Sequence, residues 1–330
     1  MFKRILVPLD TSVRAESALP VAVRIAHATG AALILLRVIS VPVEYGPYLL
    51  QSGNLMQELL DAEDEDAQSY LKGVAAREHL AGLQITTISV TGSAAQSILA
   101  TITDHNVDLV VMCSHGTTGV RRWVLGSVAQ KIVRHSPASV LILREGGMVP
   151  GATQSGVLHA LRVMVALDGS PLSEESLRPA AELAVALSPA GQAALHLTRV
   201  LHLPTGHEHD ALTEQALKDA KDYLGNIGQC LREGVYADLH LHVSWSVAID
   251  TDIAGRLIKI AEGEEGLAGG AGCDVIALAT HGRGGLQRWT MGSVTERVLG
   301  ATKLPLLVVR PEAVEEHQAA SSREQVASKS

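Results

Sequence analysis

The sequence has few aromatic residues, few cysteines and no long hydrophobic run, and each shortage excludes a class of protein. Phe, Trp and Tyr make up 3% of the residues, so a core must be built from Val, Leu, Ile and Ala, as in buried parallel sheets. The 3 cysteines include no CxxC pair, which predicts reduced thiols and excludes a disulfide framework or a zinc site. No apolar stretch approaches the roughly 18 residues needed to span a bilayer, so we expect no membrane partner.

Positive charge is also scarce, which argues against a nucleic-acid partner. Lys and Arg number 27 against 35 Asp and Glu, and the net charge is −8. The chain reaches Asp10 after only a few apolar residues, unlike a signal peptide, so the sequence predicts a cytoplasmic protein. A hydrophobic content of 47% over 330 residues allows two domains, each with its own core.

What the chain does have is an internal duplication. The segments from Val107 to Arg144 and from Cys273 to Arg310 have equal length and align without a gap. Each begins with an apolar strand, continues through a glycine-containing loop and enters a helix. A strand's carboxyl end, flexible backbone and the unpaired N–H groups of a helix start together make a pocket for phosphate. The duplication therefore predicts two nucleotide-binding halves.

The segments before the duplicated block repeat as well. Each half begins with a short apolar run that ends in Asp10 or Asp168, and a serine two residues later offers an N-cap for a helix that ends near Thr29 or Ser188. The later elements also match: second strands from Ala31 and Ala193, long acidic amphipathic helices, third strands in QITTISV and DLHLHVSW, and third helices over 94–105 and 249–262. Alternating strands and helices predict an α/β fold with helices on both faces of a parallel sheet.

The domain boundaries follow from local composition. Residues 146–160 are rich in Gly, Pro and small polar residues, which predicts a linker. Residues 313–330 have too little apolar content to pack and are predicted to be disordered. We therefore expect the first domain over residues 1–145 and the second over 161–312.

The glycine loops have a specific spacing. In the first half, residues 117–125 separate Gly116 from the pair Gly126 and Ser127. In the second half, residues 283–291 separate Gly282 from the pair Gly292 and Ser293. The glycine lets backbone N–H groups approach an anion, the serine can cap the helix, and the helix dipole favours negative charge. No GxxxxGK[ST] loop and no kinase signature are present, so the usual machinery of phosphoryl transfer is missing.

With this spacing, the chain resembles the universal stress protein family. ATP-binding members carry GxxG, a spacer of the same length, and Gly followed by Ser or Thr, and here Cys113 and Ala279 replace the first glycine. The resemblance covers both halves except the linker and tail. It implies two tandem doubly wound domains, Rossmann-like and of the adenine nucleotide alpha hydrolase type, each with a five-stranded parallel sheet of order 3-2-1-4-5.

The resemblance also implies a nucleotide site in each half. In the first half, the matching positions are Pro8, Asp10, Val38, Met112, Cys113, Gly116, Gly126, Ser127, Val128 and Ala129. In the second half, they are Ala166, Asp168, Val200, Leu278, Ala279, Gly282, Gly292, Ser293, Val294 and Thr295. Asp10 and Asp168 follow strand ends, where ligands bind in open α/β sheets, although the same aspartates also suit a purely structural capping role.

The function implied is adenine-nucleotide binding in stress response or signalling. The ligand is ATP, or ADP or AMP, with or without Mg²⁺, and hydrolysis is at most slow, with no catalytic residue and no protein metal ligand assigned. Two other interpretations stay open. A ligand-free assembly module fits Cys113 and Ala279. An ATP-consuming enzyme fits less well, because adenylating relatives would show SGGxDS where this chain has LDTSV and LDGSP.

Family members also dimerise through their last strands. The matching segments are SVLILR in the first half and PLLVVR in the second. We expect them to pair within the chain, which gives an intramolecular pseudo-dimer of the two halves. A homodimer of chains is the further possibility.

Overall fold

The chain folds around one extended β-sheet with helices on both faces. The computed structural model describes residues 1–40, 53–114, 125–144, 150, 160–189, 192–202, 211–234, 236–264, 272–280 and 291–311, with residues 53–56 as backbone only. Within these ranges, no helix combines the length and apolar character that a membrane span requires. The predicted tail lies outside the described residues, as does all of the predicted linker except Pro150 and residue 160.

The two halves contain matching elements. The first half comprises β1 (Arg4–Leu9), α1 (Val13–Glu16), α2 (Leu19–Thr29), β2 (Ala32–Ile39), α4 (Gly53–Ala75), a 3₁₀ turn (Glu78–Leu80), β3 (Ile85–Thr91), α5 (Ala94–Asp104), β4 (Leu109–Cys113), α6 (Ser127–His135) and β5 (Ser139–Leu143). The second half comprises β6 (Arg162–Ala166), α7 (Pro171–Glu174), α8 (Leu177–Leu187), β7 (Ala194–Leu201), α9 (Ala211–Glu233), a 3₁₀ turn (Ala237–Leu239), β8 (His242–Ile249), α10 (Ile253–Ala261), β9 (Val275–Ala279), α11 (Ser293–Ala301) and β10 (Leu306–Val309).

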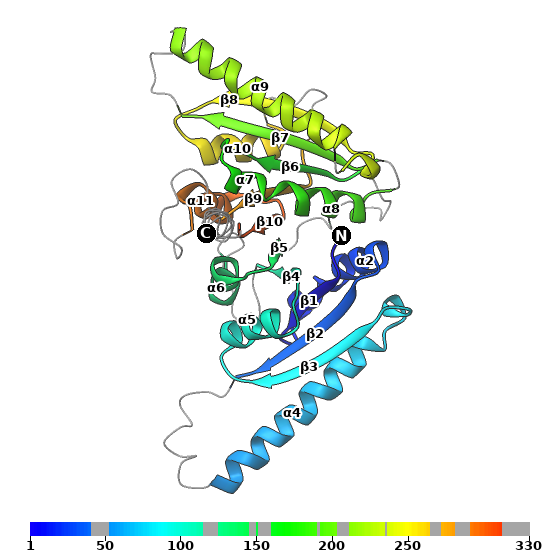
Figure 1. The fold of residues 1–330 in the computed structure, drawn as a ribbon. Coiled ribbons are helices and arrows are strands. Elements are labelled where there is room, and N and C mark those ends of the chain that lie inside the picture. The colour runs from blue at the N-terminus through cyan, green and yellow to red at the C-terminus, as the bar shows by residue number, and fades with distance from the viewer. Residues whose placement is uncertain are drawn as a thin grey trace, which may run out of the picture.

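The strands form a single 10-stranded sheet in the order β3-β2-β1-β4-β5-β10-β9-β6-β7-β8 (Figure 1). Within each half this is the order 3-2-1-4-5, so the fold prediction is confirmed. Neighbouring strands within a half run parallel, whereas β5 and β10 pair antiparallel, with Leu141 opposite Leu307. The last strands of the two halves thus join the two sheets into one.

Each face of this sheet carries its own apolar layer. One layer packs the sheet against α2, α4, α8 and α9. The other packs it against α5, α6, α10 and α11. The strands are apolar on both faces because both are covered, as expected for a parallel sheet.

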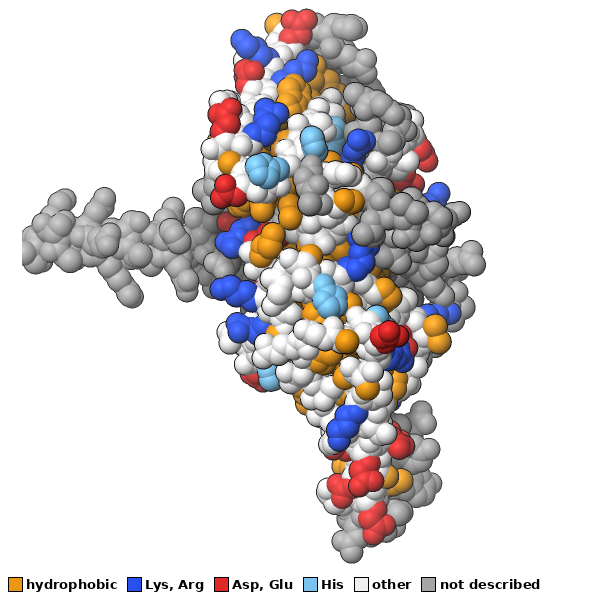
Figure 2. Space-filling model, turned by 90° about the vertical axis from the view of Figure 1, so that its right-hand side faces the viewer, with side chains coloured by type: hydrophobic (Ala, Val, Ile, Leu, Met, Phe, Trp, Pro, Cys, Tyr) orange, Lys and Arg blue, Asp and Glu red, His pale blue; other side chains and the backbone are white. Residues whose placement is uncertain are grey.

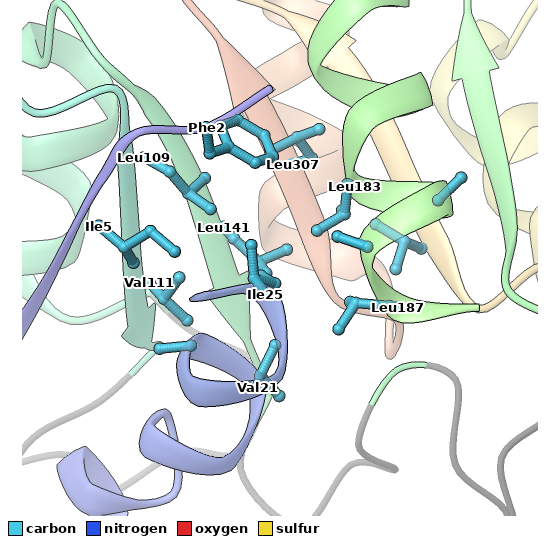
Figure 3. Close-up of a cluster of buried hydrophobic side chains, with 14 of the residues drawn as sticks. Phe2, Ile5, Val21, Ile25, Leu109, Val111, Leu141, Leu183, Leu187 and Leu307 are labelled. Atoms are coloured by element: carbon cyan, nitrogen blue, oxygen red, sulfur yellow. The ribbon is translucent and has the colours of Figure 1, made fainter. Parts of the chain in front are cut away.

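The first layer continues from one half into the other. Figure 3 shows Leu141 and Leu307, from the two central strands, beside Ile25 of α2 and Leu183 of α8. Polar contacts cross at the same place, because the guanidinium of Arg24 donates to the carbonyl oxygens of Leu187 and Pro150 at 2.7 and 2.8 Å. The halves therefore share a core, and they are more than two modules tied by a linker.

The long helix α4 covers the outer end of the first half and has a strongly acidic surface. Asp61, Glu63, Glu65 and Asp66 are exposed along it, and Figure 2 shows acidic side chains gathered at this lower end of the molecule. The outer face of α4 is thus solvated, while Leu71 points into the core. The outer end of the first half therefore carries negative charge.

The structure corrects the sequence prediction at two places. The single helix expected after each first strand is divided in two, since α2 starts afresh with Pro20 in its first turn, where the missing N–H costs no helical bond. The helix expected over 249–262 begins only at Ile253, because β8 continues to Ile249 and Asp252 caps the helix.

Candidate nucleotide site

A pocket of about 250 Å³ opens at the carboxyl end of the first-half sheet. The ends of β1, β2 and β4 form its floor, and the first turns of α5 and α6 form its sides. The lining residues are Pro8, Leu9, Asp10, Ala15, Leu36, Val38, Ser40, Ala94, Ile98, Met112, Cys113, Ser114, Gly126, Ser127, Val128 and Ala129.

The topology explains why the pocket lies there. Strand β1 pairs with β2 on one side and with β4 on the other. The helix after β1 packs on one face of the sheet and the helix after β4 packs on the opposite face. The connections thus diverge between β1 and β4 and leave a crevice at the switch point, where open α/β sheets bind ligands.

Asp10 shapes the turn that leads out of β1. Its Oδ1 accepts hydrogen bonds from the backbone N–H and the hydroxyl of Ser12, and the Ser12 hydroxyl in turn accepts from the N–H of Ala15 at 3.1 Å. Serine therefore caps α1, and the aspartate holds the serine in place. Thr11 between them has φ 68°, a left-handed conformation that ordinarily costs a non-glycine residue energy.

The second half repeats this turn. Asp168 Oδ1 accepts from the N–H and hydroxyl of Ser170 at 2.9 and 2.6 Å, and the Ser170 hydroxyl accepts from the N–H of Ser173 at 3.2 Å. Gly169 takes the place of Thr11, with φ 83°. The capping role is thus shared between aspartate and serine in both halves, and it leaves a carboxylate at the strand end.

The start of α6 differs from the sequence prediction. Gly126 is the N-cap and Ser127 the first helical residue, so the expectation that Ser127 caps the helix is wrong. The N–H of Gly126 donates to the carbonyl oxygen of Ser114 at 2.8 Å, which fastens the helix start to the end of β4. The N–H groups of Ser127, Val128 and Ala129 have no acceptor within the helix, as at every helix start, and this turn lines the pocket.

The matching helix start in the second half has a close approach that favours glycine. The N–H of Gly292 donates to the carbonyl oxygen of Thr280 at 2.8 Å, and a Cβ at Gly292 would lie 3.3 Å from that oxygen. Its φ of −59° is an ordinary value, so the preference for glycine comes from this close approach to the strand and not from an unusual backbone conformation. Ser293 is again the first helical residue, so Ser293 as a cap is also wrong.

The rest of the pocket wall is apolar. Leu36 and Val38 come from β2, Ile98 from α5, and Met112 and Cys113 from β4. Cys113 is buried, and its Sγ lies 3.0 Å from the hydroxyl of Ser17. The pocket thus has an apolar side and a polar side, the latter made by the Asp10 turn and the start of α6.

The structure brings most of the predicted first-half residues together. All of them line this pocket except Gly116, which lies outside the described residues. Sequence reasoning missed the other lining residues, which come from the ends of β1, β2 and β4 and from α1 and α5: Leu9, Ala15, Leu36, Ser40, Ala94, Ile98 and Ser114. The signal that could have found them is their position after a strand or in the first turn of a helix on the same edge of the sheet.

The predicted second-half residues occupy the matching places. Ala166 ends β6, Val200 lies in β7, Leu278 and Ala279 end β9, and Gly292, Ser293, Val294 and Thr295 start α11. Gly282 lies outside the described residues. One difference is clear: the Thr295 hydroxyl donates to the carbonyl oxygen of Ala279 at 2.9 Å, where the first half has Ala129.

The fold and the placement of these residues define a doubly wound α/β protein built from two tandem halves. A model of the universal stress protein family matches residues 1–144 and again residues 160–310. The chain therefore belongs to the universal stress protein family.

Individual relatives agree with this assignment. A universal stress protein of Methanocaldococcus jannaschii is 30% identical over 145 residues, which cover 44% of this chain and 84% of that protein. One from Mycobacterium tuberculosis is 28% identical over 214 residues, or 62% of this chain and 63% of that protein. The crystal structure of a universal stress protein from Archaeoglobus fulgidus matches with a TM-score of 0.62 at 19% identity, covering 93% of this chain and 96% of that chain, which supports the fold.

Proposed function

We propose that this chain binds an adenine nucleotide in the first-half pocket and acts as a nucleotide-binding protein in stress response or signalling. The observation that carries the proposal is the meeting of three features at one switch point. These are a carboxylate at the end of β1, an apolar wall from β2 and β4, and the open first turn of α6. Each suits a different part of a nucleotide.

Different residues of the pocket suit the base, the ribose and the phosphates of a nucleotide. Val38 and Met112 offer apolar surface for the base, the Asp10 carboxylate can accept hydrogen bonds from ribose hydroxyls, and the N–H groups that start α6 can donate to phosphate oxygens. The volume of about 250 Å³ is close to the lower end of the roughly 300–1,000 Å³ typical of ligand pockets. The fit supports a small ligand with one apolar and one anionic end.

ATP is the ligand we propose first, with ADP or AMP as weaker alternatives, because the helix start gains most from a long anionic tail. Mg²⁺ would then be held by the phosphate oxygens. Among the residues that the structure describes, no group of three or more His, Cys, Asp or Glu side chains is arranged to bind a metal ion. Bound nucleotide would supply the negative charge that the start of α6 stabilises.

Binding without rapid turnover is the role that the pocket chemistry supports. Among its described lining residues, Asp10 is the only carboxylate, and none is a lysine, arginine or histidine. The described lining residues therefore offer one candidate general base, Asp10, and no cation that could clamp a transferring phosphoryl group. Hydrolysis is then at most slow, and the bound nucleotide works as a signal.

The organisation we propose has a first domain over residues 1–145, a linker over 146–160 and a second domain over 161–312. The antiparallel pairing of β5 with β10 supports an intramolecular pseudo-dimer of these domains, because it covers two strand edges that separate halves would expose. We also propose a cytoplasmic location, as the sequence predicts.

Calorimetry of the full chain with ATP and Mg²⁺ tests the proposal, with Asp10→Asn as the variant. Asparagine keeps the acceptor for Ser12 but loses the charge, so we expect affinity to fall about tenfold or more, as for a lost hydrogen bond to a charged group. Asp61→Asn removes an equal charge from exposed α4 and should leave affinity unchanged. If millimolar ATP gives no heat with the wild-type chain, and no nucleotide copurifies, the ligand-free assembly module replaces this proposal.

A further inference from the structure

We infer that Asp250 and Asp252 make the second-half cleft reject nucleotide polyphosphates, so that each chain holds one triphosphate, in its first half. This inference rests on the proposed function and adds which half performs it. It comes from comparing the mouths of two clefts that the fold otherwise builds alike.

The two halves differ at the start of the third helix. In the first half, Gly92 and Ser93 precede α5, the Ser93 side chain makes no capping hydrogen bond, and the first turn of α5 has no acidic residue. Ala94 and Ile98 of α5 line the pocket, so this helix start faces the ligand. Its N–H groups remain open to an anion.

In the second half, two carboxylates occupy the matching place. Asp252 caps α10 by accepting from the N–H of Gly255 at 3.0 Å, and Asp250 Oδ1 accepts from the N–H of Asp252 at 2.8 Å. Two amides at this helix start, those of Asp252 and Gly255, are thus already bonded to protein carboxylates. A phosphate entering here would have to displace them or lie beside them.

Charges on the neighbouring helix increase the contrast. Arg297 of α11 donates to Asp252 Oδ2 at 2.8 Å, so the cation of this cleft is engaged by a carboxylate. The matching position in α6 is Lys131, which is exposed and forms no ion pair with any residue that the structure describes. The first turn of α11 also carries Glu296, where α6 has Gln130.

These differences change what a phosphate group meets at each mouth. The first-half mouth combines a neutral Gly92-Ser93 pair with the cation of Lys131. Among the described residues, the second-half mouth has the carboxylates of Asp250 and Asp252, with the guanidinium of Arg297 engaged by Asp252 and with Arg256 in the first turn of α10. The Glu296 carboxylate pairs with Arg134 of the other half at 2.7 Å. A phosphate group therefore meets an open helix start in the first half, whereas in the second half it meets the carboxylates of Asp250 and Asp252 beside amides that they already engage.

The test is the stoichiometry of ATP with Mg²⁺, measured by calorimetry on the full chain. We expect one site in the wild type and a second site in Asp250→Asn/Asp252→Asn, because asparagine keeps the capping oxygens and removes the charge. The matched control, Asp222→Asn/Asp238→Asn, removes two exposed carboxylates of the same half from α9 and the 3₁₀ turn before β8, and should stay at one site.

The reverse change in the first half gives an independent measurement. Ser93→Asp should weaken ATP binding about tenfold or more while leaving the affinity for uncharged adenosine unchanged. Two equal ATP sites in the wild type, a folded double variant still limited to one site, or unchanged ATP affinity in Ser93→Asp would each overturn the inference. Failure of the proposed function looks different, because neither ATP nor adenosine would then bind the wild type.

Discussion

The guanidinium of Arg144, at the end of β5, donates from Nη2 to the carbonyl oxygen of Leu299 in α11 at 2.6 Å. The reciprocal contact also exists, since Arg310 follows β10 and donates from Nη1 to the carbonyl oxygen of His135 in α6 at 3.1 Å. Each half thus places a cation at the carboxyl end of a helix in the other half, where the helix dipole favours positive charge. The two contacts differ in burial, because Arg144 is 5% exposed whereas Arg310 lies nearer the surface.

Burial makes Arg144 costly, which leads to a prediction about stability. Among the residues that the structure describes, its Nε and Nη1 have no hydrogen-bond partner, and burial lowers the pKa of this guanidinium to about 10. We expect Arg144→Met to raise the free energy of unfolding by about 1–2 kcal/mol, because a buried cation with unsatisfied donors costs more than its one hydrogen bond returns. Urea denaturation measures the change.

Arg310→Met is the control, since the same substitution at the less buried counterpart should shift stability by less than about 0.5 kcal/mol. A loss of more than about 1 kcal/mol in Arg144→Met would show instead that its contact with Leu299 stabilises the joint between the halves.

The buried imidazole of His196 leads to a prediction about how the stability of the chain depends on pH. It lies in β7 with Nδ1 2.9 Å from the Ser244 hydroxyl and Nε2 2.8 Å from the Ser246 hydroxyl. Burial, aided by the nearby charge of Arg162, lowers the pKa of His196 from 6.5 to about 4. Between these values the unfolded chain binds a proton that the folded chain does not, so the contribution of His196 to stability is complete above pH 6.5 and is lost as the pH falls.

His196→Ile tests this dependence, because Ile34 occupies the matching position in β2. The free energy of unfolding of the wild type should fall more steeply than that of the variant from pH 6.5 to pH 4, by up to about 1.4 kcal/mol per pH unit. Denaturation curves at several pH values give both slopes. Parallel slopes would mean that the imidazole is charged in the folded chain.

In the turn after β6, the backbone has a left-handed conformation that glycine adopts without strain. Gly169 has φ 83°, a region that a residue with a Cβ enters at a cost. Gly169→Ala should lower the free energy of unfolding by about 1–2 kcal/mol. Gly225 in the interior of α9 is the control, because a Cβ there meets nothing within 4 Å and alanine favours a helix, so Gly225→Ala should raise stability by about 0.5–1 kcal/mol. Equal effects of the two changes would contradict the strain.

The sequence predicts the sheet well because its signals are local and repeated. The strands that end in Asp10 and Asp168 are short apolar runs followed by turn residues, and the structure places them as β1 and β6. The start of α10 was predicted wrongly because the run Val247 to Ile249 is apolar enough for either a strand or a helix, and only its pairing with β7 selects the strand.

The candidate site was harder to predict where it depends on contacts between distant segments. The fastening of Gly126 to Ser114, which makes the glycine the cap, brings together two residues on either side of a loop. Ala94 and Ile98 reach the pocket only because α5 packs beside α6, and their own sequence carries no sign of a ligand. Local propensity places elements along the chain, whereas the neighbours of a pocket follow from tertiary packing.

The joint between the halves contains a fully buried leucine. Leu307 in β10 is 0% exposed, lies opposite Leu141 of β5 and belongs to the apolar layer that both halves share. Leu307→Ala should lower the free energy of unfolding by about 2–5 kcal/mol through lost burial and the cavity that remains. Leu212→Ala, at a side chain 85% exposed on α9, should change it by less than about 0.5 kcal/mol.

The shape of the unfolding curve tests whether the two halves unfold together. Because one core spans both halves, Leu307→Ala should lower the stability of elements in the first half as much as in the second, and the chain should unfold in a single transition. Hydrogen exchange resolves the two halves by following amides of β1 and β6. If the substitution speeds exchange in β6 and leaves β1 unchanged, the halves unfold independently, and their shared sheet contributes little to stability.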